Sequence, residues 1–195
     1  MRLGVLGGTF NPVHVGHLAL ARAARDELAL DEVLFVVAGD PWRKAGRDIA
    51  PDQDRLAMVR LAVEGEPGFA VSTIELDREG PSYTADTLEA LARERPDAEL
   101  FFIVGEDALA DLLNWRRPER IIELARLAVA RRDDVPPGAE EALPGLRERV
   151  VRLEMPIVEV SASEVRRRVR AGQPLEGLVP PPVAAYIREK GLYRA

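Results

Sequence analysis

The chain contains no cysteine, which excludes disulfide bonds, thiolate nucleophiles and cysteine-bound zinc. Long hydrophobic runs are also missing. The longest one covers residues 33–38 and is far shorter than the roughly 18–20 residues of a membrane span. No apolar stretch of signal-peptide length follows Arg2. These absences predict a cytoplasmic protein that does not contact a membrane.

Basic residues are too few for a protein that coats nucleic acid. The chain has 27 Lys and Arg against 33 Asp and Glu, a net charge of −6 and a pI near 5.2. A nucleic-acid-binding surface would require an excess of positive charge, so no nucleic-acid partner is expected. Lys44 and Lys190 are the only lysines. Because this bias toward arginine runs through the whole chain, a single arginine carries less functional information than usual.

The length and composition predict one globular domain over residues 1–195. Of these residues 47% are hydrophobic and 31% are charged, which are ordinary values for a protein with a buried core. One stretch departs from this composition, at about 132–149, where Pro, Gly and Glu are frequent. It is predicted to be a surface insertion with one short helix.

Apolar runs of strand length alternate with segments of helical periodicity. Strands are predicted at 3–7, 33–38, 69–76, 100–104, 127–130 and 150–153. Helices are predicted at 17–28, 52–64, 84–94, 107–114, 118–124, 163–171 and 182–190. Strands separated by helices indicate parallel β-α-β units. The predicted fold is therefore an α/β, Rossmann-like, doubly wound and mainly parallel sheet, with helices on both faces and a small C-terminal helical segment at about 163–193.

The segment between the first strand and the first helix has the properties of a phosphate-binding loop. Gly7 and Gly8 allow the backbone to approach a ligand closely, and the following helix start supplies free N–H groups. The segment matches neither the dinucleotide-binding fingerprint nor a Walker A loop. In a doubly wound sheet, ligands bind beyond the carboxyl ends of the strands, which is where this loop falls.

The only two histidines of the chain, His14 and His17, stand at the start of this helix. A spacing of three residues places both imidazoles on one side of a helical turn. Two structural histidines or a metal-binding pair would also explain them, but no third ligand is placed nearby. The favoured interpretation is phosphate binding, because positioned donors stabilise the charge on a transferring phosphoryl group.

Three further segments carry candidate residues. Ser163 is predicted to be the N-cap of a helix, with Arg166 one turn later facing the same anion. Ser82, Tyr83 and Thr84 precede another helix, whose amides suit a carboxylate, although plain capping explains the Ser and Thr equally well. Trp115 could stack on a flat ring or belong to the core. Lys44, in the loop after the second strand, could approach a phosphate or be solvated. Arg167, Arg168 and Arg170 are interpreted as a solvated basic face.

Residues 7–17, Gly-Gly-Thr-Phe-Asn-Pro-Val-His-Val-Gly-His, resemble the signature of the nucleotidyltransferase superfamily with the His-x-Gly-His motif. Four more segments resemble bacterial nicotinate-nucleotide adenylyltransferases, in the same order along the chain: 81–88, 105–115, 160–166 and 179–193. The histidine motif specifies the superfamily alone, whereas Pro-Ser-Tyr-Thr and Trp115 narrow the resemblance to this family. Where the family usually has Ile-Ser-Ser-Thr, this chain has Val-Ser-Ala-Ser at 160–163, so Ala162 lacks one hydroxyl.

The resemblance implies adenylyl transfer from ATP to nicotinate mononucleotide, which yields nicotinate adenine dinucleotide and pyrophosphate. Mg²⁺ would be bound through the substrate phosphates and not by a protein metal site, and a homo-oligomer is possible. The catalytic residues would be His14, His17 and Arg166, with His17 acting on the transition state and Arg166 holding the β- and γ-phosphates with Ser163. ATP would be bound by Gly7, Gly8, Thr9, Phe10, His17, Gly105, Asp107, Ser161, Ser163 and Arg166. Nicotinate mononucleotide would be bound by Lys44, Ser82, Tyr83, Thr84 and Trp115, with Trp115 stacked on the pyridine and the carboxylate received near Thr84.

Three alternatives remain open from the sequence. Pantetheine-phosphate and glycerol-phosphate nucleotidyltransferases share the histidine motif, but their chains tend to be shorter and lack the Trp115 segment. An adenylyltransferase that prefers nicotinamide mononucleotide is a nearer alternative. The chain could also be a nucleotide-binding regulator without activity, but the presence of both histidines and Arg166 argues against this.

Overall fold

The computed structural model describes residues 1–39, 49–130, 143–155 and 158–194. Six strands form one sheet: β1 (Arg2–Gly8), β2 (Glu32–Val37), β3 (Phe69–Ser72), β4 (Glu99–Val104), β5 (Ala125–Ala130) and β6 (Val150–Leu153). Their order is β3-β2-β1-β4-β5-β6, and every pair of neighbours is parallel. The order reverses between β1 and β4, which confirms the predicted doubly wound sheet and places its switch point directly after β1.

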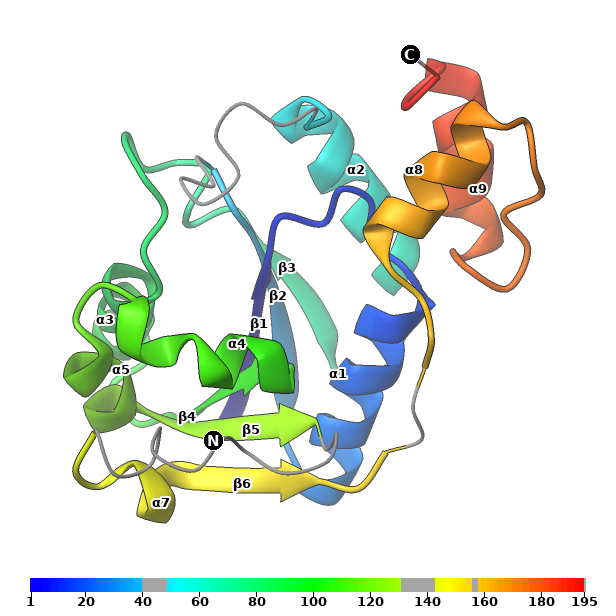
Figure 1. Cartoon of the computed structure of the whole chain (residues 1–195). Helices are drawn as coiled ribbons and strands as arrows, with labels where there is room; N and C mark the ends of the chain where they lie inside the picture. Colours follow the sequence, from blue (N-terminus) through cyan, green and yellow to red (C-terminus); the bar gives the residue numbers. More distant parts are fainter. Residues whose placement is uncertain (40–48, 131–142, 156–157, 195) are drawn as a thin grey trace.

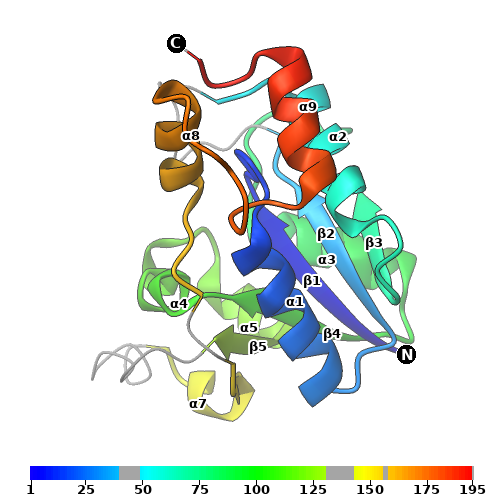
Figure 2. The ribbon, with the colours of Figure 1, turned by 90° about the vertical axis from the view of Figure 1, so that its right-hand side faces the viewer.

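Helices cover both faces of the sheet (Figures 1 and 2). One face carries α1 (Val15–Glu27), α2 (Asp52–Val63), α8 (Ala162–Arg170) and α9 (Pro181–Lys190). The other carries α3 (Thr84–Glu94), α4 (Glu106–Ala110), the 3₁₀ helix η2 (Leu112–Asn114), α5 (Pro118–Leu124) and α7 (Leu146–Arg149).

Each face of the sheet has its own hydrophobic core, and the strands contribute side chains to both. In β1, Leu3 and Val5 belong to the core on the face that carries α3, and Leu6 belongs to the core on the face that carries α1, so both sides of this strand are buried. Strands that are buried on both faces carry continuous apolar runs, which is the pattern that predicted them.

Two predicted elements are wrong in extent. The strand predicted at 69–76 ends at Ser72. There the Ser72 hydroxyl accepts a hydrogen bond from Ile74 N–H, and Thr73 C=O accepts one from Asp77 N–H, so a turn replaces the strand pairing. The single helix predicted at 107–114 divides at Asp111 into α4 and η2.

The predicted surface insertion is described only in its second part. Residues 131–142 lie outside the described part of the chain. After them, Leu143 and Leu146 are buried in the core on the face of the sheet that carries α3 and α5. Leu146 begins α7, the short helix that was expected here. Two leucines at this spacing anchor the end of the insertion to the domain.

Candidate active site

The loop that connects β1 to α1 at the switch point is buried. Thr9, Phe10 and Asn11 expose at most 9% of their surface. Phe10 has a φ of 47°, in the left-handed region, and its ring folds back over Gly8. A Cβ at Gly8 would lie 3.0 Å from that ring, so a larger residue would displace Phe10. Gly8 is therefore required for the shape of this loop.

His14 and His17 are brought together, as their spacing predicts. Their rings stack with centroids 3.6 Å apart, and the edge of Phe10 packs against His17 at 5.0 Å. The main-chain N–H of His14 donates to Nδ1 of His17 at 3.1 Å. Since Nδ1 accepts a hydrogen bond, we infer that neutral His17 carries its proton on Nε2, which is then a donor for a ligand oxygen.

His14 is the N-cap residue of α1 and is 9% exposed. A Cβ at Gly16 would lie 3.0 Å from Nδ1 of His14, so the glycine of the His-x-Gly-His motif makes room for this ring. Burial lowers the pKa of His14 from 6.5 to about 4. The ring is therefore neutral at physiological pH.

This lowered pKa makes the stability of the fold depend on pH. Between pH 6.5 and 4, the unfolded chain protonates His14 and the folded protein does not, so stability falls as the pH falls. A difference of this size corresponds to about 3 kcal/mol over that window. We expect urea unfolding of His14→Asn to lose correspondingly less stability than the parent between pH 6.5 and 4. Parallel curves for the two proteins would contradict the burial of a neutral His14.

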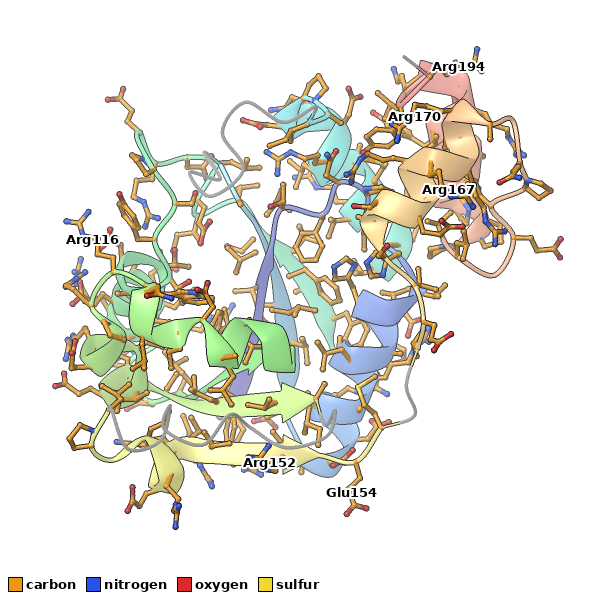
Figure 3. All side chains as sticks on the ribbon, viewed as in Figure 1. Arg116, Arg152, Glu154, Arg167, Arg170 and Arg194 are labelled. Carbon is orange, nitrogen blue, oxygen red and sulfur yellow. The ribbon has the colours of Figure 1, made fainter. Side chains whose placement is uncertain are left out.

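Arg166 reaches this loop from α8. Its Nη1 donates to the peptide oxygen of Asn11 at 2.7 Å, and its Nη2 donates to the Ser163 hydroxyl at 3.3 Å. By contrast, Arg167 and Arg168 both pair with Glu164, whose pKa is held at about 2 by these hydrogen bonds. Figure 3 shows Arg167 and Arg170 further along the same helix. Arg166 is thus the arginine of α8 that joins the phosphate loop.

The predicted N-cap of α8 is wrong. Ser161, not Ser163, is the N-cap residue, and its hydroxyl accepts from the main-chain N–H of Glu164 at 3.1 Å. Residues 161–164 read Ser-x-x-Glu, which is the capping-box pattern, so the sequence contains the signal that identifies Ser161. Ser163 lies inside the first turn, where its hydroxyl is free to accept from Arg166.

Arg55, which sequence reasoning missed, holds the loop between β1 and α1 by hydrogen bonds. Its side chain is fully buried in α2, and it donates to the peptide oxygens of Thr9 at 2.8 Å and Ala50 at 3.1 Å. It also contacts Gly39 C=O at 3.4 Å and pairs with Asp52. Arg55 is one helical turn from Val59 and stands on the same apolar face of α2. A charged residue on such a face was the available signal.

Asn11 joins three separate parts of the chain. Its side-chain oxygen accepts from Ala50 N–H at 3.0 Å and from the Tyr193 hydroxyl at 2.8 Å, and its peptide oxygen accepts from Arg166. The sequence motif indicates a role for the glycines and histidines around Asn11. The three partners of Asn11 are distant in sequence, so the spacing of residues in the motif does not predict these hydrogen bonds.

The second candidate region lies at the start of α3. Tyr83 is the N-cap residue, and its side chain does not cap the helix. The Ser82 hydroxyl accepts from Gly39 N–H at 3.0 Å, which rules out helix capping as the explanation of this serine. Within the described chain, the first turn of α3 therefore keeps main-chain N–H groups that no cap side chain occupies.

Trp115 follows η2 and is half-buried. Its Nε1 donates to Asp111 at 3.2 Å, and its ring packs edge-on against Phe102 at 6.0 Å. The next residue, Arg116, places its guanidinium 4.5 Å from the centre of the Tyr83 ring and so joins this segment to α3 (Figure 3). Arg116 is a second residue that sequence reasoning missed. Of the two roles left open for Trp115, the structure shows the packing against the core; stacking on a ligand ring stays a prediction.

Two of the predicted residues lie wholly or partly outside the described part of the chain. Lys44 is in the segment 40–48, and the side chain of Asp107 is likewise not described. The main chain of Asp107 is in α4, for which Gly105 is the N-cap residue directly after β4. Across the described residues, no three potential metal-ligating side chains come together. Among the same residues, no helix has the length and apolar character to cross a membrane.

The strand order, the glycine loop at the switch point and the paired histidines define an α/β protein that binds a nucleotide or a related phosphate. Comparison with known proteins agrees. Residues 5–168 match the model of the cytidylyltransferase-like family.

The chain belongs to this family and, within it, to the nicotinate-nucleotide adenylyltransferases. A probable nicotinate-nucleotide adenylyltransferase of Thermomicrobium roseum is 48% identical over 99% of this chain and 92% of its own. One from Dehalococcoides mccartyi is 48% identical over 99% of this chain and 97% of its own. The solved Plasmodium falciparum nicotinic acid mononucleotide adenylyltransferase complexed with NaAD has the same fold, with a TM-score of 0.80 at 16% identity over 98% of this chain and 97% of its own.

Proposed function

We propose that this chain transfers the adenylyl group of ATP to nicotinate mononucleotide. An oxygen of the mononucleotide phosphate forms a bond to the α-phosphorus of ATP, the bond from that phosphorus to the bridging oxygen breaks, and pyrophosphate leaves. The observation that carries the proposal is the convergence of His17 and Arg166 on one buried loop at the switch point. The relatives named above carry this activity in their names.

The loop supplies positioned donors, and the chemistry requires no covalent intermediate. In-line displacement between two bound nucleotides needs alignment and charge neutralisation. We assign Nε2–H of His17 to the reacting phosphoryl group and the guanidinium of Arg166, with Ser161 and Ser163, to the outer phosphates. The neutral ring of His14 supports His17 by stacking and contributes to the same site. The main chain at Gly7, Gly8, Thr9 and Phe10 lines it, and Gly105 and Asp107 are assigned to the nucleoside of ATP.

The other end of the site is assigned to nicotinate mononucleotide. The main-chain amides at the start of α3, at Tyr83 and Thr84, suit the carboxylate. Ser82 is assigned to the same end of the site, where its hydroxyl accepts from Gly39 N–H. Trp115 is half-buried, and its ring is assigned to stack on the pyridine. Lys44 is assigned to the mononucleotide phosphate.

Mg²⁺ is proposed to bind through the substrate phosphates. The described residues offer no carboxylate cage, and Mg²⁺ is commonly held by phosphates and water where a protein gives few ligands. The ion would neutralise phosphate charge. We also keep as proposals the single domain over 1–195, a cytoplasmic location and a homo-oligomer.

The test is pyrophosphate release with ATP and Mg²⁺ and, in turn, nicotinate mononucleotide, nicotinamide mononucleotide, pantetheine phosphate and glycerol phosphate. We expect rapid release with nicotinate mononucleotide and a dinucleotide product identified by mass. Release that is faster with one of the last two compounds would assign the chain to another branch of the family. No release with any acceptor would indicate a nucleotide-binding protein without activity.

Arg166→Lys should lower kcat/KM for ATP by about tenfold or more. A single ammonium cannot reproduce the forked contact that a guanidinium makes with Asn11, Ser163 and a phosphate. Steady-state kinetics with ATP as the varied substrate measures the effect. Arg170→Lys is the matched control, because Arg170 is exposed further along α8, and it should retain the activity of the parent. Equal values of kcat/KM for ATP in the two variants would show that Arg166 has no role in ATP binding beyond that of the solvated arginines of α8.

A further inference from the structure

The last residues of the chain return to the phosphate loop. Tyr193 follows α9 and Gly191, adopts a φ of 64° and is 7% exposed within the core that α1, α2 and α9 share. Its hydroxyl donates to the side-chain oxygen of Asn11 at 2.8 Å, across 182 positions of sequence. A residue that is third from the C-terminus therefore contacts the loop that carries the histidines.

This contact belongs to a wider attachment of the C-terminal segment. Leu178 C=O accepts from the main-chain N–H of Val15, the first residue of α1, at 2.9 Å. Tyr186 in α9 donates its hydroxyl to Asp54 in α2 at 2.8 Å. Figures 1 and 2 both show α9 beside α2 at the end of the sheet where the loop lies. Of these three contacts, Tyr193 is the one that fixes a side chain of the loop.

Asn11 transmits the position of Tyr193 to Arg166. The side-chain oxygen of Asn11 is held by Tyr193 and by Ala50 N–H, which restrains the side-chain rotamer of Asn11 and the place of the residue in the loop. The peptide oxygen of the same residue accepts from Nη1 of Arg166 at 2.7 Å. A shift of Asn11 would therefore displace the guanidinium, and small displacements of a positioned group are costly to catalysis.

We propose that Tyr193 is a positioning residue for adenylyl transfer, acting through Asn11 on Arg166. The proposal rests on the proposed function and deepens it. The hydroxyl touches no reacting group, so its effect is on the placement of groups that do. The C-terminal tail is in this sense part of the ATP site.

Tyr193→Phe tests the proposal, because it removes one hydroxyl and leaves the buried ring in place. Asn11 keeps its bond from Ala50, so the variant is expected to fold, with a thermal midpoint within a few degrees of the parent. We expect kcat/KM for ATP to fall about tenfold, while KM for nicotinate mononucleotide changes less than twofold. A general loss of stability would affect the kinetic constants for both substrates alike.

Tyr186→Phe is the matched control. It removes the same group from the same C-terminal segment, but its partner Asp54 lies on α2 and not in the loop. We expect this variant to keep kcat and the KM for ATP within twofold of the parent, even if it loses as much stability. An equal loss in both variants would show that Tyr193 acts only through stability.

The route through Arg166 is tested by combining Tyr193→Phe with Arg166→Lys. If Tyr193 acts by placing the guanidinium, its removal should cost less than twofold once the guanidinium is gone. Additive losses would overturn the proposal, as would parent-like kinetics in Tyr193→Phe or loss of its fold at the assay temperature. Equilibrium binding of a non-hydrolysable ATP analogue provides a second readout, which should weaken severalfold in Tyr193→Phe. If the parent binds this analogue but turns over no acceptor, the proposed function is wrong. The comparison of analogue binding between the parent and Tyr193→Phe would still decide whether Tyr193 positions the ATP site.

Discussion

His17→Ala should fold normally and lose turnover by about 10²-fold or more. The main-chain N–H of His14 donates to Nδ1 of His17, so the neutral ring carries its proton on Nε2, which we assign as the donor to the reacting phosphoryl group. A positioned donor acts mainly on charge that develops in the transition state, so its removal lowers kcat more than it raises KM. The loss of one such donor typically costs 10²–10³-fold in kcat.

Steady-state kinetics of the variant measures this effect, with the thermal midpoint as a check on folding. His17→Asn is a useful companion, because its shorter amide can still donate and should recover part of the rate. If kcat stays within a few-fold of the parent and only KM changes, His17 is a ground-state binding residue and its assignment to the transition state is wrong.

Nicotinate mononucleotide should be preferred over nicotinamide mononucleotide by at least about 10²-fold in kcat/KM. The start of α3 offers main-chain N–H groups and the positive end of a helix dipole, which both favour a carboxylate. A carboxamide placed there directs its NH₂ at one of these donors and leaves it unpaired. An unpaired buried donor costs ~1–3 kcal/mol, or roughly 5–150-fold, and two would cost more.

Parallel assays with the two mononucleotides test this preference, with ATP saturating. Trp115→Ala is the matched control, because a ring that stacks on the pyridine meets both substrates alike. It should weaken both substrates and leave their ratio unchanged. Equal kcat/KM with the two substrates in the parent would show that the assignment of the carboxylate to the amides near Thr84 is wrong and that the chain accepts both mononucleotides.

The parts of the molecule that sequence could predict are those set by local pattern. Apolar runs buried on both faces identified the strands, and their alternation with helices implied the parallel order. The pairing of His14 with His17 followed from three residues of helical spacing. The N-cap of α8 also has a local signal in Ser161 and Glu164, but Ser163, two positions after Ser161, offers the same type of capping side chain.

The contacts that shape the loop could not be found in this way. Arg55 binds Thr9 across 46 positions and Tyr193 binds Asn11 across 182, so both contacts exist only after the sheet has brought α2 and α9 to β1. In sequence, Arg55 stands out only as a charged residue on the apolar face of a helix, and nothing there identifies Thr9 as its partner. Tyr193 is an aromatic residue near a terminus. Their roles are set by tertiary packing, which residue type and spacing do not encode.

The buried guanidinium of Arg55 has a consequence for how nucleotide is captured. Its acceptors are peptide oxygens and the Asp52 carboxylate, all within the protein itself, so it holds the β1–α1 loop in place independently of any substrate. The conformational entropy of this loop is lost when the chain folds and not when the ligand arrives. Its amide protons should then exchange with solvent only through the larger openings that also release α2. Nucleotide would dock onto a surface that is already rigid, without an ordering step to slow its entry or release.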